Sequence, residues 1–290
     1  MGGREGSEAT DTGTQKGMPN PLPRLCNPPI VRHHCLHHRR RRDLADAPIF
    51  LYLCFCFLAA GTIKGAVGMG LPTTSIALMT LTFDPRRAIA LLLIPMLVTN
   101  AWQVYRMGDI SGAFRRYLPF ILTLVIGVWL SVTLSVNAPD RLLFGLLGVA
   151  LLFFVLVTAT KLAIAIPDQH DRPAQIGFGA VAGMIGGVTS VWAPPMAIYL
   201  ASRRVAKDEF VRASGLLIFL GGLPLIAGYF RNGIMTRETA TLSGIMLLPA
   251  MAGFALGERA RRHMSEDVFR KLLLVVFFFM GLNLLRRAMF

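Results

Sequence analysis

The stretch GTIKGAVGMGLPTTSIALMTLTFDP, residues 61–85, decides how this chain folds. Apolar sequence flanks it, yet within twelve residues it holds a lysine, a proline and four glycines: Lys64, Pro72, Gly61, Gly65, Gly68 and Gly70. Proline lacks an N–H and glycine is conformationally permissive, so Gly70-Leu71-Pro72 should interrupt a helix. Interrupted backbone at membrane depth is tolerated only where it is buried or lines a cavity. We therefore expect a break here, followed by a helix N-terminus near Pro72 whose free N–H groups attract anions.

The same pattern recurs 122 residues later, in GMIGGVTSVWAPPMAIYL, residues 183–200. The shift gives six identities in eighteen positions: Gly61, Ile63, Gly65, Pro72, Ile76 and Leu78 align with Gly183, Ile185, Gly187, Pro194, Ile198 and Leu200. A packing seam between helices is the ordinary reason for glycines in a membrane protein. Two apolar segments interrupted by glycine and proline, one in each half, instead indicate a transporter binding site.

The composition is that of a membrane protein. Of the 290 residues 54% are hydrophobic, the mean hydropathy is +0.55, and several apolar runs approach the roughly 20 residues that span a bilayer. Strict apolar/polar alternation is missing, which excludes a β-barrel. We predict an all-α, polytopic transmembrane helical bundle in the lipid bilayer of a bacterial inner or plasma membrane.

A net charge of +14 is compatible with a nucleic-acid partner, but the distribution of the charges indicates a membrane protein instead. Residues 48–290 hold 22 Lys or Arg and 11 Asp or Glu, almost all in short loops. An excess of Lys and Arg in short loops is what the positive-inside rule produces. We therefore expect no nucleic acid as partner, and we expect the loops at 203–207 and 259–262 to be cytoplasmic.

Four regions follow from this pattern: a disordered basic tail (1–47), a first transmembrane repeat (48–160), a polar linker (161–173) and a second repeat (174–290). Each repeat holds three full spans and a broken unit that counts as one or two crossings. If each half has five crossings, the two halves are inverted relative to each other. If the first half has five crossings and the second has four, the N-terminus lies inside the cell. Both alternatives remain open. In detail we expect a short helix at 73–83, a charged loop at 106–116 and a helix at 175–190.

Polar side chains inside the apolar segments are the candidates for binding a substrate. Lys64 is the only charged residue deep in a break, which favours a role in attracting an anion. The alternative interpretation is that its side chain snorkels to the membrane interface. Asn100 and Gln103 share a helical face and are candidates for binding a polar substrate. The alternative interpretation is that they form hydrogen bonds between helices. The predicted substrate-binding residues are Lys64, Gly65, Gly68, Gly70, Pro72, Asn100, Gln103, Gly187, Thr189, Ser190 and Pro194.

Catalytic and metal chemistry find little support in this sequence. All acidic residues of 48–290 lie in loops or at span ends, so Ser75 and Ser190 have no base at membrane depth. The histidines lie in the tail or in loops, and no metal-site or disulfide framework is legible from the cysteines. We predict no enzyme activity, no cofactor and no metal. The alternatives to a membrane transporter are a non-transporting membrane scaffold and an intramembrane enzyme. A homo-oligomer is compatible with the sequence.

At these residues the chain resembles the TauE/SafE family of sulfite exporters. The resemblance rests on the glycine pattern ending in proline in each half, on Thr99, Asn100, Trp102 and Gln103, and on Gly228, Tyr229, Asn232 and Gly233. It covers about 48–287 and implies a membrane carrier of small anions such as sulfite or organosulfonates. Two departures, the short spacing before Pro72 and the Ser190 and Trp192 that replace glycines, leave the substrate open.

Overall fold

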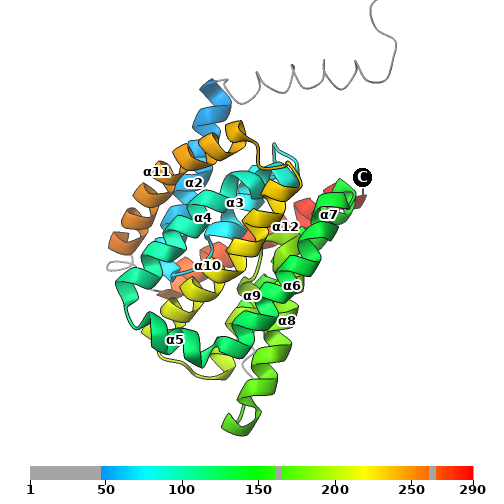
Figure 1. Cartoon of the computed structure of the whole chain (residues 1–290). Helices are drawn as coiled ribbons and strands as arrows, with labels where there is room; N and C mark the ends of the chain where they lie inside the picture. Colours follow the sequence, from blue (N-terminus) through cyan, green and yellow to red (C-terminus); the bar gives the residue numbers. More distant parts are fainter. Residues whose placement is uncertain (1–46, 161–164, 261–265, 290) are drawn as a thin grey trace, which may run out of the picture. The chain divides into compact units, whose positions relative to one another are not determined.

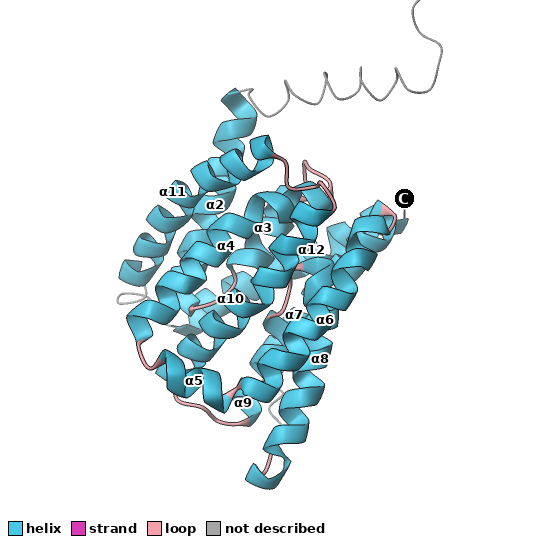
Figure 2. Cartoon of the chain, viewed as in Figure 1, coloured by secondary structure: helices cyan, strands magenta, loops and turns pink. Residues whose placement is uncertain are grey.

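Helices make up all the regular structure in the part of the chain that the computed structural model describes, residues 47–160, 165–260 and 266–289 (Figure 2). The predicted all-helical class is confirmed, and the predicted tail at 1–47 lies outside these residues except for its last position. Figure 1 labels most of the elements, which are α2 (Ala47–Val67), α3 (Leu71–Met79), α4 (Pro85–Met107), α5 (Ile110–Arg116), α6 (Leu118–Asn137), α7 (Asp140–Thr160), the 3-10 helix η1 (Asp168–His170), α8 (Asp171–Thr189), α9 (Ala193–Ser202), α10 (Lys207–Arg231), α11 (Arg237–Ala260) and α12 (Glu266–Met289).

The first break separates α2 from α3. Gly68 and Gly70 have φ angles of 88° and 110°, in the left-handed region that glycine enters without a steric penalty. Gly70 is the N-cap of α3, and Pro72 lies in its first turn, where a missing N–H costs no intrahelical bond. The predicted interruption is present. The helix that follows ends at Met79, earlier than the predicted residue 83, because the chain turns after that residue.

The second break separates α8 from α9, where Ser190 has a φ of 58°. Two prolines lie in the first turn of α9, Pro194 and Pro195, and they preclude continuation of the preceding helix. α8 begins at Asp171, four residues before the predicted start at 175. An acidic residue in the first turn stabilises a helix start, and this signal was available in the sequence.

The chain reverses direction at each break, so that each short helix returns along the long one. Tyr52 in the second turn of α2 donates its hydroxyl to the Leu78 carbonyl near the end of α3, at 2.6 Å. Tyr199 in α9 likewise donates to the carboxylate of Asp171, the first residue of α8, at 2.8 Å. Only a hairpin brings together the start of one helix and the end of the next. α2 and α4 therefore begin at the same end of the bundle. A count of five crossings in each half would require this arrangement, because it treats the broken unit as two crossings.

Residues 106–116 contain a short helix, so the prediction of a charged loop was wrong for most of this segment. The carboxylate of Asp109 accepts a hydrogen bond from the Gly112 N–H at 3.2 Å and caps α5. α5 and α6 are bent by 76° about Tyr117, and together they are apolar enough for one bent span. Asp is a preferred capping residue, but the charges of Arg115 and Arg116 made the segment read as a loop.

Helices from the two predicted halves pack against each other in matching pairs. α2 packs on α11 and α8 packs on α6, while α4 packs on α11 and α10 packs on α6. α4 also packs on α10, and α7 packs on α12. Figure 1 shows α2 beside α11 and α6 beside α8. Adding 122 to the starts of α3 and α4, which are 71 and 85, gives 193 and 207, the starts of α9 and α10.

Glycines hold two of these pairs at backbone contact. A Cβ atom added to Gly61 of α2 would lie 2.2 Å from the carbonyl oxygen of Ala250 in α11. One added to Gly183 of α8 would lie 2.5 Å from the carbonyl oxygen of Leu124 in α6. Because real Cβ atoms stay more than 3.0 Å from such atoms, no other residue fits at these positions without moving a helix.

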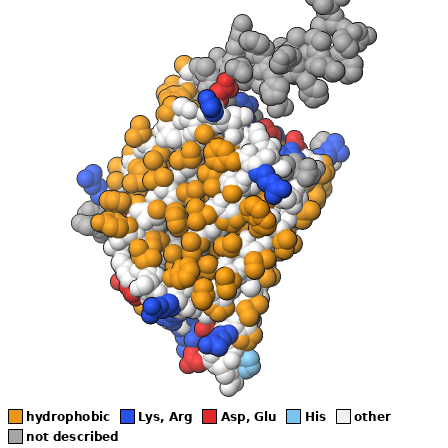
Figure 3. Space-filling model, in the orientation of Figure 1, with side chains coloured by type: hydrophobic (Ala, Val, Ile, Leu, Met, Phe, Trp, Pro, Cys, Tyr) orange, Lys and Arg blue, Asp and Glu red, His pale blue; other side chains and the backbone are white. Residues whose placement is uncertain are grey.

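Five helices in the described residues are long and apolar enough to cross a membrane, or six if the α5–α6 pair counts as one bent span. Figure 3 shows hydrophobic side chains over the middle of the visible face and charged side chains towards its two ends. Leu51 and Leu248 are among the large apolar side chains left exposed, at 67% and 73%. An apolar belt between charged ends suits a bilayer, and the chain is a multi-pass membrane protein. The predicted count of three full spans and a broken unit in each half stays a prediction.

A matched pair of substitutions on α11 tests the glycine contact. In Gly253→Ala the new Cβ would lie 2.1 Å from the Leu58 carbonyl oxygen of α2, whereas at Gly244 it meets nothing within 4 Å. Gly253→Ala should therefore destabilise the fold by about 1–3 kcal/mol through overpacking. Gly244→Ala should be neutral or stabilising because alanine is the better helix former. Thermal denaturation of both purified variants in detergent measures the difference; equal melting temperatures would contradict a close α2–α11 contact.

Candidate functional site

Lys64 lies one turn before the first break and is buried inside the bundle. Its side chain is 1% exposed, and its Nζ donates a hydrogen bond to Oδ1 of Asn100 on α4 at 2.7 Å. Asn100 is itself fully buried and donates from Nδ2 to the Met96 carbonyl at 2.7 Å. The ammonium group is therefore turned towards α4, and the snorkelling alternative does not describe it.

Gln103, one turn further along α4, connects the first break to α10. Its Nε2 donates to the Val211 carbonyl at 2.7 Å, while its buried Oε1 has no hydrogen-bond partner in the described part of the chain. Gly68 lies against the same α10 residue, because a Cβ there would meet Cγ2 of Val211 at 3.0 Å. The structure thus brings Lys64 to Asn100, and Gly68 and Gln103 to Val211.

The other predicted residues of the first break shape the backbone. Gly65 packs on α11, where an added Cβ would lie 2.1 Å from the Phe254 carbonyl oxygen. Gly70 and Pro72 start α3, as described above. Thr74 was not among the predicted residues. Its buried hydroxyl has no partner among the described residues, although it follows Pro72 by only two positions. The hydroxyl run Thr73-Thr74-Ser75 was the signal for it.

At the second break, most of the predicted residues serve the fold. Gly187 packs on α6, where a Cβ would lie 2.0 Å from Oγ of Ser131. Thr189 donates to the Ile185 carbonyl at 2.7 Å and accepts from the Val191 N–H at 3.2 Å. Pro194 lies in the first turn of α9. Ser190 differs from these, because its fully buried hydroxyl has no partner among the described residues.

Within the described residues, this arrangement provides buried hydrogen-bond donors and sets no carboxylate as the hydrogen-bond partner of Lys64. The partner that the structure gives to Lys64 is a neutral amide rather than a carboxylate. A buried charge without an opposite charge is strongly destabilising, and an anionic ligand would relieve that penalty. Buried polar groups without partners are likewise uncommon in native proteins, so the hydroxyls of Thr74 and Ser190 are sites where a ligand or water is expected.

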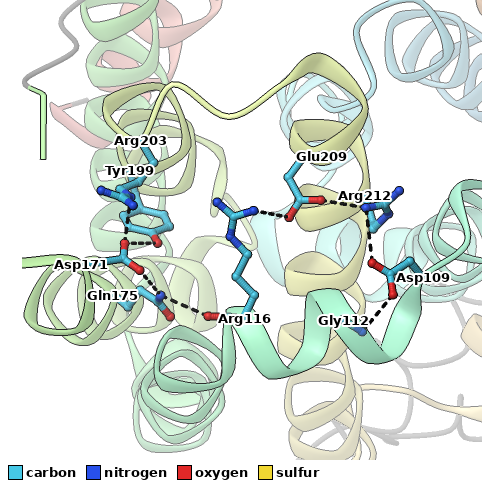
Figure 4. Close-up of polar contacts among 9 residues, drawn as sticks. All are labelled: Asp109, Gly112, Arg116, Asp171, Gln175, Tyr199, Arg203, Glu209 and Arg212. Atoms are coloured by element: carbon cyan, nitrogen blue, oxygen red, sulfur yellow. Dashed lines mark hydrogen bonds and ion pairs between the residues drawn. The ribbon is translucent and has the colours of Figure 1, made fainter. Parts of the chain in front are cut away.

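A network of charged residues closes one end of the bundle (Figure 4). Its first part centres on Asp171 at the start of α8. The carboxylate of Asp171 accepts from the Tyr199 hydroxyl at 2.8 Å and from Nε2 of Gln175 at 2.9 Å, and it pairs with Nε of Arg203 at 3.0 Å. Arg203 also pairs with Asp168 at 2.5 Å, and this hydrogen bond raises the pKa of its guanidinium. Asp171 and Asp168 therefore hold the end of α9 against the start of α8.

The second part of this charged network centres on Glu209 at the start of α10. Glu209 pairs with Arg212 at 2.8 Å, and Arg212 pairs with Asp109 at 3.8 Å. Arg116 of α5 joins the two parts, because its Nη1 lies 3.7 Å from Glu209 and its carbonyl accepts from Nε2 of Gln175 at 3.1 Å. The network also adjoins the first break, since Arg212 follows Val211. The sequence alone does not indicate this network, since its members are scattered along the chain.

Adjacent arginines test this network. Arg203→Gln should lower stability by about 1.5–3 kcal/mol, the contribution of hydrogen bonds to charged groups, because the side chain contacts Asp168, Asp171 and the Ile166 carbonyl. Arg204 is exposed, and Arg204→Gln should change stability by less than about 0.5 kcal/mol. Thermal melting of the two variants in detergent measures this, and a similar loss in both would show that the network contributes little.

Comparison with known proteins adds one positive finding. A model of the family described as "Sulfite exporter TauE/SafE" matches residues 53–284. This range contains both breaks, α4 and α10. Neither the search of curated proteins nor the search of solved structures gave a match.

Proposed function

The chain belongs to the sulfite exporter TauE/SafE family, and from this premise we propose that it is a secondary carrier or facilitator of small sulfur-containing anions, of the sulfite or organosulfonate type. The family implies a membrane transporter and not an enzyme. The multi-pass helical fold agrees with that class.

The buried Lys64–Asn100 contact is the observation that carries the proposal. It places an ammonium group next to an interruption of the membrane helix, with an amide as its partner at 2.7 Å. Anion sites in proteins are built from such cations, from amide and hydroxyl donors and from helix N-termini. The first turn of α3, with the unpartnered hydroxyl of Thr74, supplies further donors beside the same break.

We further infer that the two segments 48–160 and 174–290 are structural repeats, and that the first long helix of each repeat packs on a helix of the other repeat. The offset of 122 between helix starts and the matching pairs α2–α11 and α8–α6 support this inference. In transporters built from repeats, substrate sites lie at the interface between the repeats. α4 and α10, which pack on each other beside the breaks, are the helices expected to form that interface.

The orientation that we propose places the charged network on the cytoplasmic side. Arg106, near the end of α4, pairs with Glu258 near the end of α11 at 2.8 Å. Arg212, near the start of α10, donates to the carbonyl of Met107, the last residue of α4. The ends of α4 and α11 and the start of α10 therefore lie together. Short loops rich in Lys and Arg are retained inside. Residues 261 and 262 of the second basic loop lie outside the described residues.

The transport activity is tested by reconstituting the purified chain in proteoliposomes. Uptake of radiolabelled sulfite, of sulfoacetate and of other small anions is measured with and without a pH gradient. We expect saturable uptake of at least one sulfur oxyanion above the rate of protein-free vesicles. Absence of flux for the whole panel would contradict a carrier, and dependence on the pH gradient would identify protons as the coupling ion.

Asn100→Asp separates a binding role from a structural one. The substitution keeps the size of the side chain and turns the Lys64 contact into an ion pair, so the helices stay joined while the positive charge is neutralised. We expect the apparent affinity for sulfite to fall about tenfold or more, corresponding to at least 1.4 kcal/mol. The lost Nδ2 hydrogen bond to the Met96 carbonyl should also lower the melting temperature, so affinity is measured on the folded protein. Gln169→Glu, at an exposed position, is the control for an added negative charge. Normal affinity in the Asn100→Asp variant would end the case for an anion at Lys64.

A further inference from the structure

The indole of Trp192 is buried at the second break in a notch formed by two glycines. Trp192 is 2% exposed, and a Cβ added to Gly186 of α8 would lie 1.9 Å from its Nε1. A Cβ added to Gly221 of α10 would lie 3.5 Å from the same atom. The indole therefore requires glycine on α8. Its N–H nevertheless has no acceptor among the described residues.

Ser190 supplies a second unused donor in the same break. Its side chain is fully buried, its hydroxyl has no partner among the described residues, and its φ of 58° is unfavourable for a residue other than glycine. Its backbone N–H is satisfied by the Gly186 carbonyl at 2.7 Å, so only the side chain is left over. Strained backbone beside unpaired donors is typical of sites whose geometry is maintained for a ligand.

The chemistry of the two donors restricts what binds them. An indole N–H only donates, so its partner must be an acceptor, and a buried donor without one loses the free energy of a hydrogen bond. Neither group is charged. Such a pair suits a group with several acceptor oxygens on one centre, which takes one hydrogen bond on each of two oxygens.

The charged and the neutral donors lie at a similar depth. Contacts between α4 and α10 give the level of Asn100. A Cβ on Gly222 of α10 would meet Leu97 of α4 at 2.8 Å, and one on Gly215 would meet Gln103 at 3.0 Å. Asn100 lies between these two α4 residues. The level of Asn100, and hence of Lys64, thus lies between Gly215 and Gly222 on α10. Trp192 contacts Gly221, within the same stretch of that helix.

We propose that Trp192 and Ser190 are the neutral half of the anion site: Nε1 of Trp192 and Oγ of Ser190 donate hydrogen bonds to the oxygens of a sulfite or sulfonate group. This inference rests on the proposed function and deepens it. It assigns recognition of the oxygens to the second break and attraction of the charge to Lys64 at the first. Ser190 and Trp192 then become determinants of substrate choice.

Tryptophan fluorescence tests the contact directly. Trp102 and Trp129 are 43% and 46% exposed, so the double variant Trp102→Phe/Trp129→Phe should fold and leaves Trp192 as the single tryptophan. Sodium sulfite or methanesulfonate should shift the emission of Trp192 saturably, because the indole N–H gains a hydrogen bond. Sodium chloride at the same ionic strength should not. An emission spectrum unaffected by both sulfur oxyanions, or shifted equally by chloride, would overturn the proposal.

Variants in the single-tryptophan background locate the site. Ser190→Ala should weaken the affinity measured by fluorescence about tenfold. Gly186→Ala should displace the indole and abolish the shift, whereas Gly177→Ala on the same helix, where an added Cβ meets nothing within 4 Å, should retain it. If Gly186→Ala does not fold, Ser190→Ala decides alone, and an unchanged affinity there refutes the shared site.

Transport separates this inference from the proposed function. In proteoliposomes, Trp192→Phe should raise the KM for sulfite about tenfold while the protein remains folded. Uptake by the wild type with an unchanged KM in Trp192→Phe would overturn the inference and leave the carrier proposal standing. Absence of uptake by the wild type would remove the carrier proposal itself. A lowered melting temperature with an unchanged KM would show that Trp192 only packs.

Discussion

Backbone contact between α2 and α11, and between α8 and α6, is the interaction on which the rest of the structure depends. Lipid tails are as apolar as the side chains, so helices in a bilayer associate through close packing rather than through the hydrophobic effect. Glycines such as Gly61 and Gly183 allow that approach. Each contact joins a helix of one half to a helix of the other half. The two hairpins are therefore held inside the bundle, where their interrupted backbone is protected from lipid.

The burial of the breaks explains the distribution of polar groups. A side chain in this interior must find a partner or leave its hydrogen-bonding capacity unused. Lys64 finds Asn100, and Gln103 finds the Val211 carbonyl. Ser190 and Trp192 find none among the described residues. Around α4 and α10 the described part of the bundle thus combines the buried amino group of Lys64 with unused neutral donors, a combination that suits an anion.

The carboxylates serve a different purpose, which is visible in their positions. Asp109, Asp171 and Glu209 lie at one end and pair with arginines of α5 and α10 and with the arginine that follows α9 (Figure 4). Ion pairs at such partly exposed positions contribute modestly one by one, and more where several form a network. These carboxylates are therefore paired in the charged network, whereas Lys64 has an amide as its partner. The family's transport of anions is consistent with that division.

Local chemistry determined much of this structure from the sequence alone: the hydropathy of the spans and the breaks at Gly70-Leu71-Pro72 and at Pro194, because backbone preferences and apolar length act over a few residues. The site was only partly predictable. Gly65 and Gly187 stay predicted binding residues, and they also lie in packing seams, because close backbone approach and ligand binding both select small residues. Only the tertiary structure decided that Lys64 meets Asn100 and that the N–H of Trp192 stays unpaired, since such pairings depend on which helices become neighbours and at what height they cross.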